Sequence, residues 1–138
     1  MADRSTILGI DPGSARIGLA IADTETRFAH PLEVVAATKK AFDRIVEVAQ
    51  EHGVVKIVVG KPIGLSGRDG PAVDEQKRFV SGLRARTDIP IEEFDERLTT
   101  VVAEAGLRAA GTRSKERKEK RDAVAAQVLL QGFLDSTR

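Results

Sequence analysis

The sequence predicts a single mixed α/β domain, and three observations favour this fold class. The 138 residues include 41% hydrophobic and 31% charged side chains, a balance typical of a globular domain with a sizeable core. Two apolar runs, Thr6–Ile10 and Val54–Val59, have the length of buried strands. A helix is predicted between them, and the order strand, helix, strand favours parallel pairing in a helix-covered sheet. Residues 1–138 contain no internal repeat or linker, so we expect one domain.

The N-terminal part predicts three strands. Thr6–Asp11 reads as the first strand, Gly13 suits a tight turn, and Ala15–Asp23 is expected to return as an antiparallel partner. A third strand is expected from about Arg27 to Ala36. Pro31 indicates an edge position or a bulge there, because proline cannot donate a hydrogen bond to a neighbouring strand.

The remaining sequence alternates helices and strands. Thr38 is the expected N-cap of a helix that runs to His52, with Gly53 as its stop signal. After the strand Val54–Val59, the glycine-rich stretch Gly60–Gly70 predicts a loop. The later expected elements are a helix from Pro71 to about Arg86, a strand from Pro90 to Glu96, a short helix from Leu98 to Ala110 and a final helix from about Lys120 to Leu134.

Composition limits the chemistry that this chain can perform. Zero cysteines exclude a disulfide framework and a thiolate zinc site, and His30 and His52 alone cannot build a zinc site. Residues 1–5 lack the basic-then-apolar pattern of a signal peptide, and no apolar run approaches the length of a membrane span. We therefore expect a soluble, cytoplasmic protein with no membrane partner.

Acidic residues at the ends of three predicted elements are the candidates for chemistry. Asp11 ends the first strand, Asp95 and Glu96 end the strand before the short helix, and Asp122 opens the final helix. Carboxylates that converge either share a divalent cation or repel one another and raise a pKa. Carboxylate-bound Mg²⁺ or Mn²⁺ is therefore the leading hypothesis.

Each of these acids also has a structural interpretation. Asp11 begins a good turn sequence. Asp122 would be stabilised by the helix dipole in a first turn, but it also heads an apolar stripe and should therefore point inward. Strand alternation puts Asp95 and Glu96 on opposite faces without choosing between them, and a helix-capping role fits Asp95 slightly better.

Basic residues are the candidates for substrate binding. Residues 111–121, called here the basic segment, hold six basic residues and two acids, a local net charge of +4, without apolar anchors. We interpret this segment as a mobile arm that binds phosphates by counterion release, with a solvated loop or frayed helix end as the alternative. The candidate substrate-binding residues are Arg16, Lys61, Arg113, Lys115, Arg117 and Lys118. With no Trp or Tyr and only five Phe, we expect no base-stacking platform.

Four ordered blocks, which run nearly end to end, resemble the YqgF/RuvX family. They are Ile7–Gly13 with Arg16–Ala20, Val58–Gly67, Asp95–Thr100, and Asp122–Ala126 with Leu129–Gln131. The resemblance implies an RNase-H-like fold with a central five-stranded mixed sheet flanked by helices. Its metal-binding acids fall on Asp11, Glu96 and Asp122, which favours Glu96 over Asp95. Lys61 departs from the family pattern, which usually has a hydrophobic residue there.

The resemblance implies a metal-dependent endonuclease that matures the 5′ end of pre-16S rRNA, with two Mg²⁺ or Mn²⁺ ions held by the three acids. One alternative is a Holliday junction resolvase, which should be a two-fold homodimer, whereas an rRNA nuclease can work as a monomer. A second alternative is a non-catalytic RNA-binding factor for ribosome assembly. A third is phosphate binding in the manner of sugar kinases and actin-like ATPases, although those proteins close two such domains around ATP.

Overall fold

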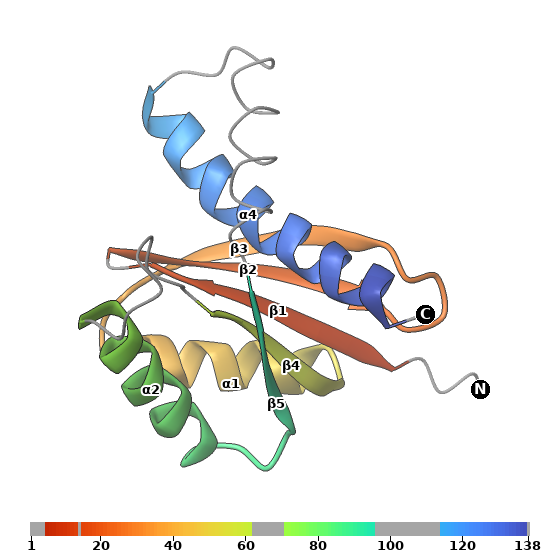
Figure 1. Ribbon diagram of the computed structural model, residues 1–138, viewed down its shortest axis with the longest axis horizontal. Helices are drawn as coiled ribbons and strands as arrows, with labels where there is room; N and C mark the ends of the chain where they lie inside the picture. The colour runs from red at the N-terminus through yellow and green to blue at the C-terminus, as the bar shows by residue number, and fades with distance from the viewer. Residues whose placement is uncertain (1–4, 14, 62–70, 96–113, 138) are drawn as a thin grey trace.

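The computed structural model describes residues 5–13, 15–61, 71–95 and 114–137 (Figure 1). These residues form one sheet with the strand order β3-β2-β1-β4-β5. The described elements are β1 (Thr6–Pro12), β2 (Arg16–Asp23), β3 (Ala29–Ala36), α1 (Ala41–Glu51), β4 (Val54–Lys61), α2 (Pro71–Arg84), β5 (Ile91–Asp95) and α4 (Ser114–Ser136). The predicted five-stranded mixed sheet is thus confirmed, whereas the helix expected at Leu98–Ala110 lies outside the described residues.

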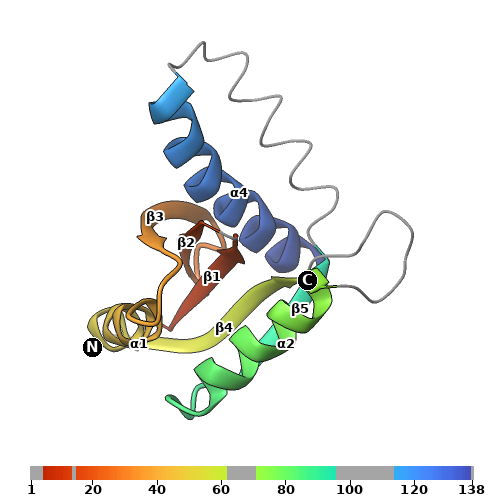
Figure 2. The same ribbon diagram turned by 90° about the vertical axis from the view of Figure 1, so that its left-hand side faces the viewer.

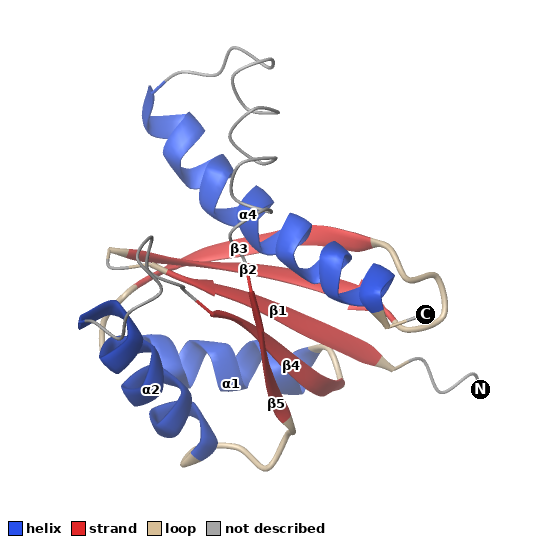
Figure 3. Ribbon diagram, in the orientation of Figure 1, coloured by secondary structure: helices blue, strands red, loops and turns tan. Residues whose placement is uncertain are grey.

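Helices cover both faces of this sheet. Helices α1 and α2 lie on one face, and α4 crosses the other (Figures 2 and 3). Alternating side chains of each strand enter two separate cores, one beneath α1 and α2 and one beneath α4. Among the described helices, none is long and apolar enough to cross a membrane.

The register of the sheet brings three strand ends to one edge. β1 pairs in parallel with β4, and β4 pairs in parallel with β5. Ile10 of β1 is level with Val59 of β4, and the next residue of β4, Gly60, is level with Phe94 of β5. The carboxyl ends of β1, β4 and β5 therefore meet at the same edge, as they must in parallel strands.

The predicted starts of the glycine-rich loop and of the first helix differ from the structure. β4 continues through Lys61, which pairs with Asp95, so the start of the predicted loop at Gly60 is wrong. Helix α1 begins at Ala41 rather than after Thr38, and its N-cap residue Lys40 makes no side-chain capping hydrogen bond. The Thr38 hydroxyl instead accepts the Lys40 N–H at 3.3 Å, the local turn by which threonine competes with helix formation.

The expected start of the final helix at about Lys120 is wrong, because most of the basic segment belongs to that helix. α4 begins at Ser114, so residues 114–121 are helical. Lys, Glu and Arg are strong helix formers, and Glu116 precedes Lys120 by four residues, the spacing of a favourable charge pair. Helix propensity can therefore extend the helix here without apolar residues. Arg113 lies outside the described residues.

The expected edge position of the third strand is confirmed. β3 lies at the end of the sheet, and its pairing with β2 shifts register between Leu19, which pairs with Glu33, and Ala20, which pairs with Pro31. Proline is tolerated at this position, because β3 is an edge strand and its pairing with β2 is irregular there.

Gly9 allows a close approach of α4 to β1. A Cβ atom at this position would lie 2.8 Å from Leu130 Cβ and 3.4 Å from the carbonyl oxygen of Ala126. We predict that Gly9→Ala lowers the free energy of unfolding by about 1–3 kcal/mol, because the added methyl group overpacks the contact. Urea unfolding of the two proteins measures this difference. Equal midpoints and slopes would show that α4 does not pack so closely on β1.

Candidate functional site

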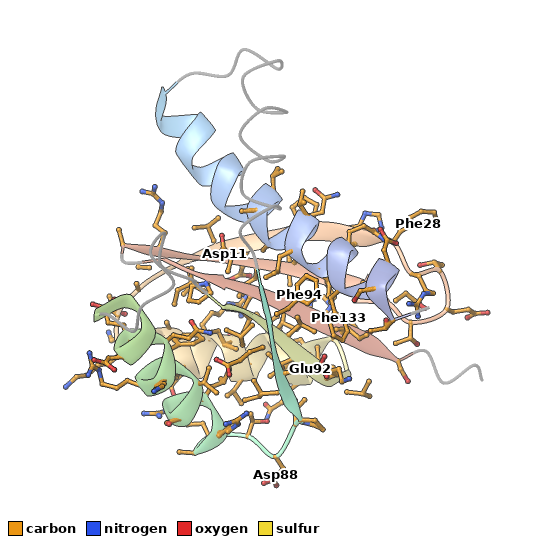
Figure 4. The ribbon with its side chains drawn as sticks, in the orientation of Figure 1. Asp11, Phe28, Asp88, Glu92, Phe94 and Phe133 are labelled. Carbon is orange, nitrogen blue, oxygen red and sulfur yellow. The ribbon has the colours of Figure 1, made fainter. Side chains whose placement is uncertain are left out.

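Asp11 lies at the carboxyl edge of the sheet, on the face covered by α4. Ile7 belongs to the core beneath α4, and Gly9 contacts that helix directly, so alternation places Asp11 on the same face. Figure 4 shows Asp11 on the side of the sheet where α4 lies. Its side chain is only partly exposed. The strand thus holds this carboxylate on the α4 face, at the carboxyl edge of the sheet.

α4 runs antiparallel to β1. At its C-terminal end, the guanidinium group of Arg27 donates to the carbonyl oxygen of Leu134. Arg27 follows β2, whose last residue Asp23 pairs with Thr6 at the start of β1. The end of α4 therefore lies beside the start of β1, and going back along α4 leads toward Asp11 (Figure 1).

This direction places the backbone of Asp122 toward the site. Asp122 lies one helical turn before Ala126, which contacts Gly9. Because α4 runs antiparallel to β1, this turn lies beyond Gly9 in the direction of Asp11. The stripe that Asp122 heads is buried at its other predicted positions, which are Ala126, Leu129 and Phe133. The side chain of Asp122 itself is not among those described.

The expectation that Asp122 opens the final helix is wrong. It lies more than two turns after Ser114, the first residue of α4. The helix dipole acts within the first turn, so it does not explain an acid at this position. The interpretation that remains from the sequence is the inward-facing stripe.

The end of β5 completes the edge. Phe94 packs edge-to-face on Phe133 of α4, with ring centroids 5.9 Å apart. The next residue back, Glu93, accepts a hydrogen bond from Gln76 of α2 at 3.3 Å. Phe94 therefore faces α4 and Glu93 faces α2. Asp95 ends the strand with its side chain undescribed, and Glu96 lies outside the described residues.

The candidate substrate-binding residues are only partly described. Arg16 lies on the α4 face, because its neighbour Ile17 is buried in the core beneath α1 and α2. It is two residues from Gly18, the partner of Asp11 in the sheet. Lys61 ends β4 at the same edge. Lys115, Arg117 and Lys118 lie in the first turns of α4. The side chains of Lys61 and of these three α4 residues are not described.

No three acidic or histidine side chains come together to hold a metal ion within the described part of the chain. Two of the three predicted ligands cannot contribute there, because Glu96 and the Asp122 side chain are not described. Oxygen ligands of the predicted kind suit Mg²⁺ and Mn²⁺, so the donor chemistry fits these ions.

Gln76 is a residue that sequence reasoning missed. It is the buried polar side chain of the described core, with 5% of its surface exposed. Its amide nitrogen donates to the carbonyl oxygen of Gly60 at 2.8 Å and to Glu93, so it ties α2 to the ends of β4 and β5. A signal was present in the sequence, since Gln76 shares helical spacing with the buried residues Val80 and Leu83.

The ion pair of Arg44 braces the segment between β3 and α1. Its guanidinium group makes two bonds to the Glu33 carboxylate, of 2.7 and 2.8 Å, and it also contacts Glu47 and Glu51. The hydrogen bond from Arg44 holds the pKa of Glu33 below its usual value. This contact fixes α1 against the edge strand at the end of the sheet that carries Asp11.

Comparison with known proteins agrees with this architecture. The model of the RuvX family, described as Holliday junction resolvase, matches residues 5–136. The chain belongs to the RuvX family. A relative from Chloroflexus aggregans, named "Putative pre-16S rRNA nuclease", is 44% identical and aligns with 99% of this chain and 97% of its own length. A relative of the same name from Anaeromyxobacter sp. (strain K) is 42% identical, over 93% of this chain and 95% of its own. The family resemblance read from the sequence is therefore confirmed.

Solved structures establish the fold. RuvC of T. thermophilus in complex with a Holliday junction substrate has a TM-score of 0.60 at 17% identity, over 96% of this chain and 95% of that chain. Fowlpox virus resolvase in complex with Holliday junction DNA also has a TM-score of 0.60, at 11% identity, over 96% and 98% of the two chains. Identities this low support the architecture alone. The predicted RNase-H-like fold is confirmed.

Proposed function

We propose that this RuvX protein is a metal-dependent endonuclease that acts in the 5′-end maturation of pre-16S rRNA. The observation that carries the proposal is the convergence of Asp11, the end of β5 and the Asp122 segment of α4 at one edge and one face of the sheet. Membership of RuvX supports a nuclease, and the names of the relatives favour pre-rRNA as the substrate. We place the activity in the cytoplasm.

Asp11, Glu96 and Asp122 are the proposed metal ligands and catalytic residues. If the alternation of β5 continued one residue beyond Asp95, position 96 would have the parity of Phe94, which faces α4 as Asp11 does. This parity supports Glu96 rather than Asp95. Mg²⁺ or Mn²⁺ bound by these carboxylates supplies Lewis acidity toward the scissile phosphate.

The remaining steps belong to the residues of the chain and to water. Water attacks the phosphorus atom as the bond to the 3′-oxygen breaks, and the proton that the water loses is balanced by one that the 3′-oxygen gains, so the products carry a 5′-phosphate and a 3′-hydroxyl group. Arg16, on the same face as Asp11, is positioned to pair with a phosphate oxygen of the backbone. The Lys61 position at the end of β4 offers a second cation at the same edge.

Holliday junction cleavage is the second candidate, because the family model carries that description. The two candidates differ in substrate and in symmetry. A resolvase must cut two strands related by a two-fold axis, which requires a homodimer, whereas a single copy can cut rRNA.

A cleavage assay with purified protein tests the proposal. Precursor 16S rRNA and four-way junction DNA are each incubated with Mg²⁺, Mn²⁺ or EDTA, and the mass of the protein in solution is measured in parallel. We expect endonucleolytic cuts in the precursor rRNA that EDTA abolishes. Symmetric cuts in the junction by a dimer, with the rRNA intact, would favour the resolvase. No cleavage of either substrate with any ion would favour a non-catalytic RNA-binding factor.

The basic segment gives a prediction of its own. Replacing Arg113, Lys115, Arg117 and Lys118 with Ala should weaken binding to RNA of any sequence and flatten its dependence on salt, while bound RNA is still cleaved. Each phosphate contact contributes about −0.7 to the slope of log K against log salt concentration on single strands and about −0.9 on duplexes. Binding titrations at several salt concentrations measure the slope. An unchanged slope on RNA and on junction DNA would show that this segment does not contact phosphates.

A further inference from the structure

A cavity of about 600 Å³ opens directly after Asp11, on the opposite face of the sheet from α4. Its walls come from the end of the β1–β2 hairpin, the connection from β3 into the first turn of α1, and one side of α2. Its volume is in the range of cavities that bind small molecules or one building block of a polymer. The proposed cleavage chemistry uses none of the side chains on the α1 and α2 walls.

The inner wall of the cavity is aromatic. Phe42 and Phe79 both line it, with their rings stacked at a centroid distance of 5.5 Å and an interplanar angle of 29°. The Arg86 guanidinium lies 4.5 Å from the centroid of the Phe42 ring. Because both rings line the cavity, they give it an aromatic apolar wall, against which a nucleobase of any sequence can pack.

The rim carries two cations and one acid. Lys39 and Arg78 line the cavity with exposed side chains, as does Glu75. The two cations suit a phosphate group, and the Glu75 carboxylate can accept a hydrogen bond from an exocyclic amino group of a base. An aromatic wall with a net positive rim matches a nucleotide within a strand better than an uncharged apolar ligand.

Hydrogen bonds hold these walls in place. The Gly13 N–H donates to the carbonyl oxygen of Arg16 at 2.9 Å, and the Ala37 N–H donates to that of Ala15 at 3.0 Å. Arg44 fixes α1 to β3, as described above. The cavity is therefore shaped before a ligand arrives, which lowers the entropy lost on binding.

We propose that this cavity binds one unpaired nucleobase of the nucleic-acid substrate, packed against Phe42 and Phe79, with the adjoining phosphate at Lys39 and Arg78. The inference rests on the proposed function and specifies its substrate. Pro12 and Gly13, which line the cavity, directly follow Asp11 in the chain, and consecutive Cα atoms are about 3.8 Å apart. The cavity and the Asp11 side chain lie on opposite faces of the sheet at the same edge, so the strand would pass over this edge and the bound base would belong to a nucleotide near the scissile phosphate. Cleavage then requires a base that is free of its duplex partner at that place.

The aromatic content of the sequence predicted no such platform. Two of the five Phe residues meet here from helices that are far apart in the chain, which composition cannot reveal. A free mononucleotide offers the same chemistry, a base with a phosphate, so the experiment must distinguish it from a strand.

The test compares binding of a short single-stranded RNA with binding of an abasic strand of the same length, in EDTA so that neither is cut. The variants are Phe79→Leu, which keeps an apolar side chain but removes the ring, and Arg78→Ala. Lys77→Ala is the matched control for charge, because Lys77 is an exposed cation of α2 that does not line the cavity. Thermal unfolding of each variant confirms that it is folded.

We expect the wild type to prefer the RNA over the abasic strand by about 5- to 150-fold, the range of base stacking on an aromatic side chain. Phe79→Leu should lose most of this preference. Arg78→Ala should weaken both strands by the same factor, and more than Lys77→Ala does. An equal preference in the wild type and Phe79→Leu overturns the proposal, as does AMP that binds the cavity and is not displaced by RNA.

These outcomes are separate from those of the cleavage assay, since binding in EDTA does not depend on turnover. A Phe79-dependent preference without cleavage of any substrate would retain the base site and reject the nuclease. Metal-dependent cleavage, together with a preference for RNA over the abasic strand that is the same in the wild type and Phe79→Leu, would retain the nuclease and reject the base site.

Discussion

Replacing Asp122 with Asn should abolish cleavage and leave the metal-free protein at least as stable as the wild type. A bound metal ion stabilises the charge of the transition state by several kcal/mol, and each 1.36 kcal/mol corresponds to a factor of ten in rate. We therefore expect cleavage to slow by roughly a thousandfold or more. If the Asp122 carboxylate is a metal ligand beside Asp11, stability should not fall, because two nearby carboxylates repel each other in the folded state when no cation is bound. Single-turnover cleavage and thermal unfolding in EDTA measure the two effects.

Asp88→Asn is the matched control. Asp88 is an exposed acid just before β5, at the opposite edge of the sheet from Asp11 (Figure 4). This substitution removes the same charge and should change neither rate nor stability. Wild-type activity in Asp122→Asn, or a clear loss of its melting temperature in EDTA, would remove Asp122 from the site.

Strong local patterns predicted most of the fold. The apolar runs at Thr6–Ile10 and Val54–Val59 became the interior strands β1 and β4, as expected for strands that are buried on both faces. Pro31 indicated the edge strand, because proline lacks the N–H that a residue of a central strand donates. In these segments the local preference and the tertiary contacts agree.

The errors in element boundaries occur where the sequence has no periodic pattern of apolar residues. Nothing apolar marks the start of α4 at Ser114, since charged residues with high helix propensity extend the helix beyond its packed part. Gly60 and Lys61 read as loop, but pairing with Phe94 and Asp95 draws them into β4. In both places the deciding interaction is invisible to hydrophobic patterning.

The candidate site was likewise predictable from the sequence only in part. The sequence locates Asp11 at a strand end, and the structure adds which face of the sheet it occupies. The cavity beside Phe42 and Phe79 depends on segments that meet only in the folded chain, so no spacing rule could reveal it. The burial of Gln76, in contrast, has a signal in its helical spacing with Val80 and Leu83.

Glu96→Gln and Asp95→Asn should have opposite effects on activity and stability. If position 96 continues the alternation of β5, it shares the face of Phe94 and of Asp11, whereas position 95 shares the face of Glu93, which contacts α2. Glu96→Gln should then reduce the cleavage rate as strongly as Asp122→Asn does. Asp95→Asn should keep most of the activity and lower the free energy of unfolding by about 0.5–2 kcal/mol, if this acid caps the helix predicted to follow.

A metal titration distinguishes the two roles more sharply than either rate alone. A ligand variant should need a higher Mn²⁺ concentration for half-maximal cleavage of the same RNA, or should not respond to Mn²⁺ at all. A capping variant should respond to Mn²⁺ as the wild type does, but should unfold at a lower urea concentration. The reverse pattern, with Asp95→Asn inactive and Glu96→Gln merely destabilised, would mean that the chain leaves β5 with a twist or bulge at Asp95. The alternation of β5 would then end before the site, and Asp95 would be the third ligand.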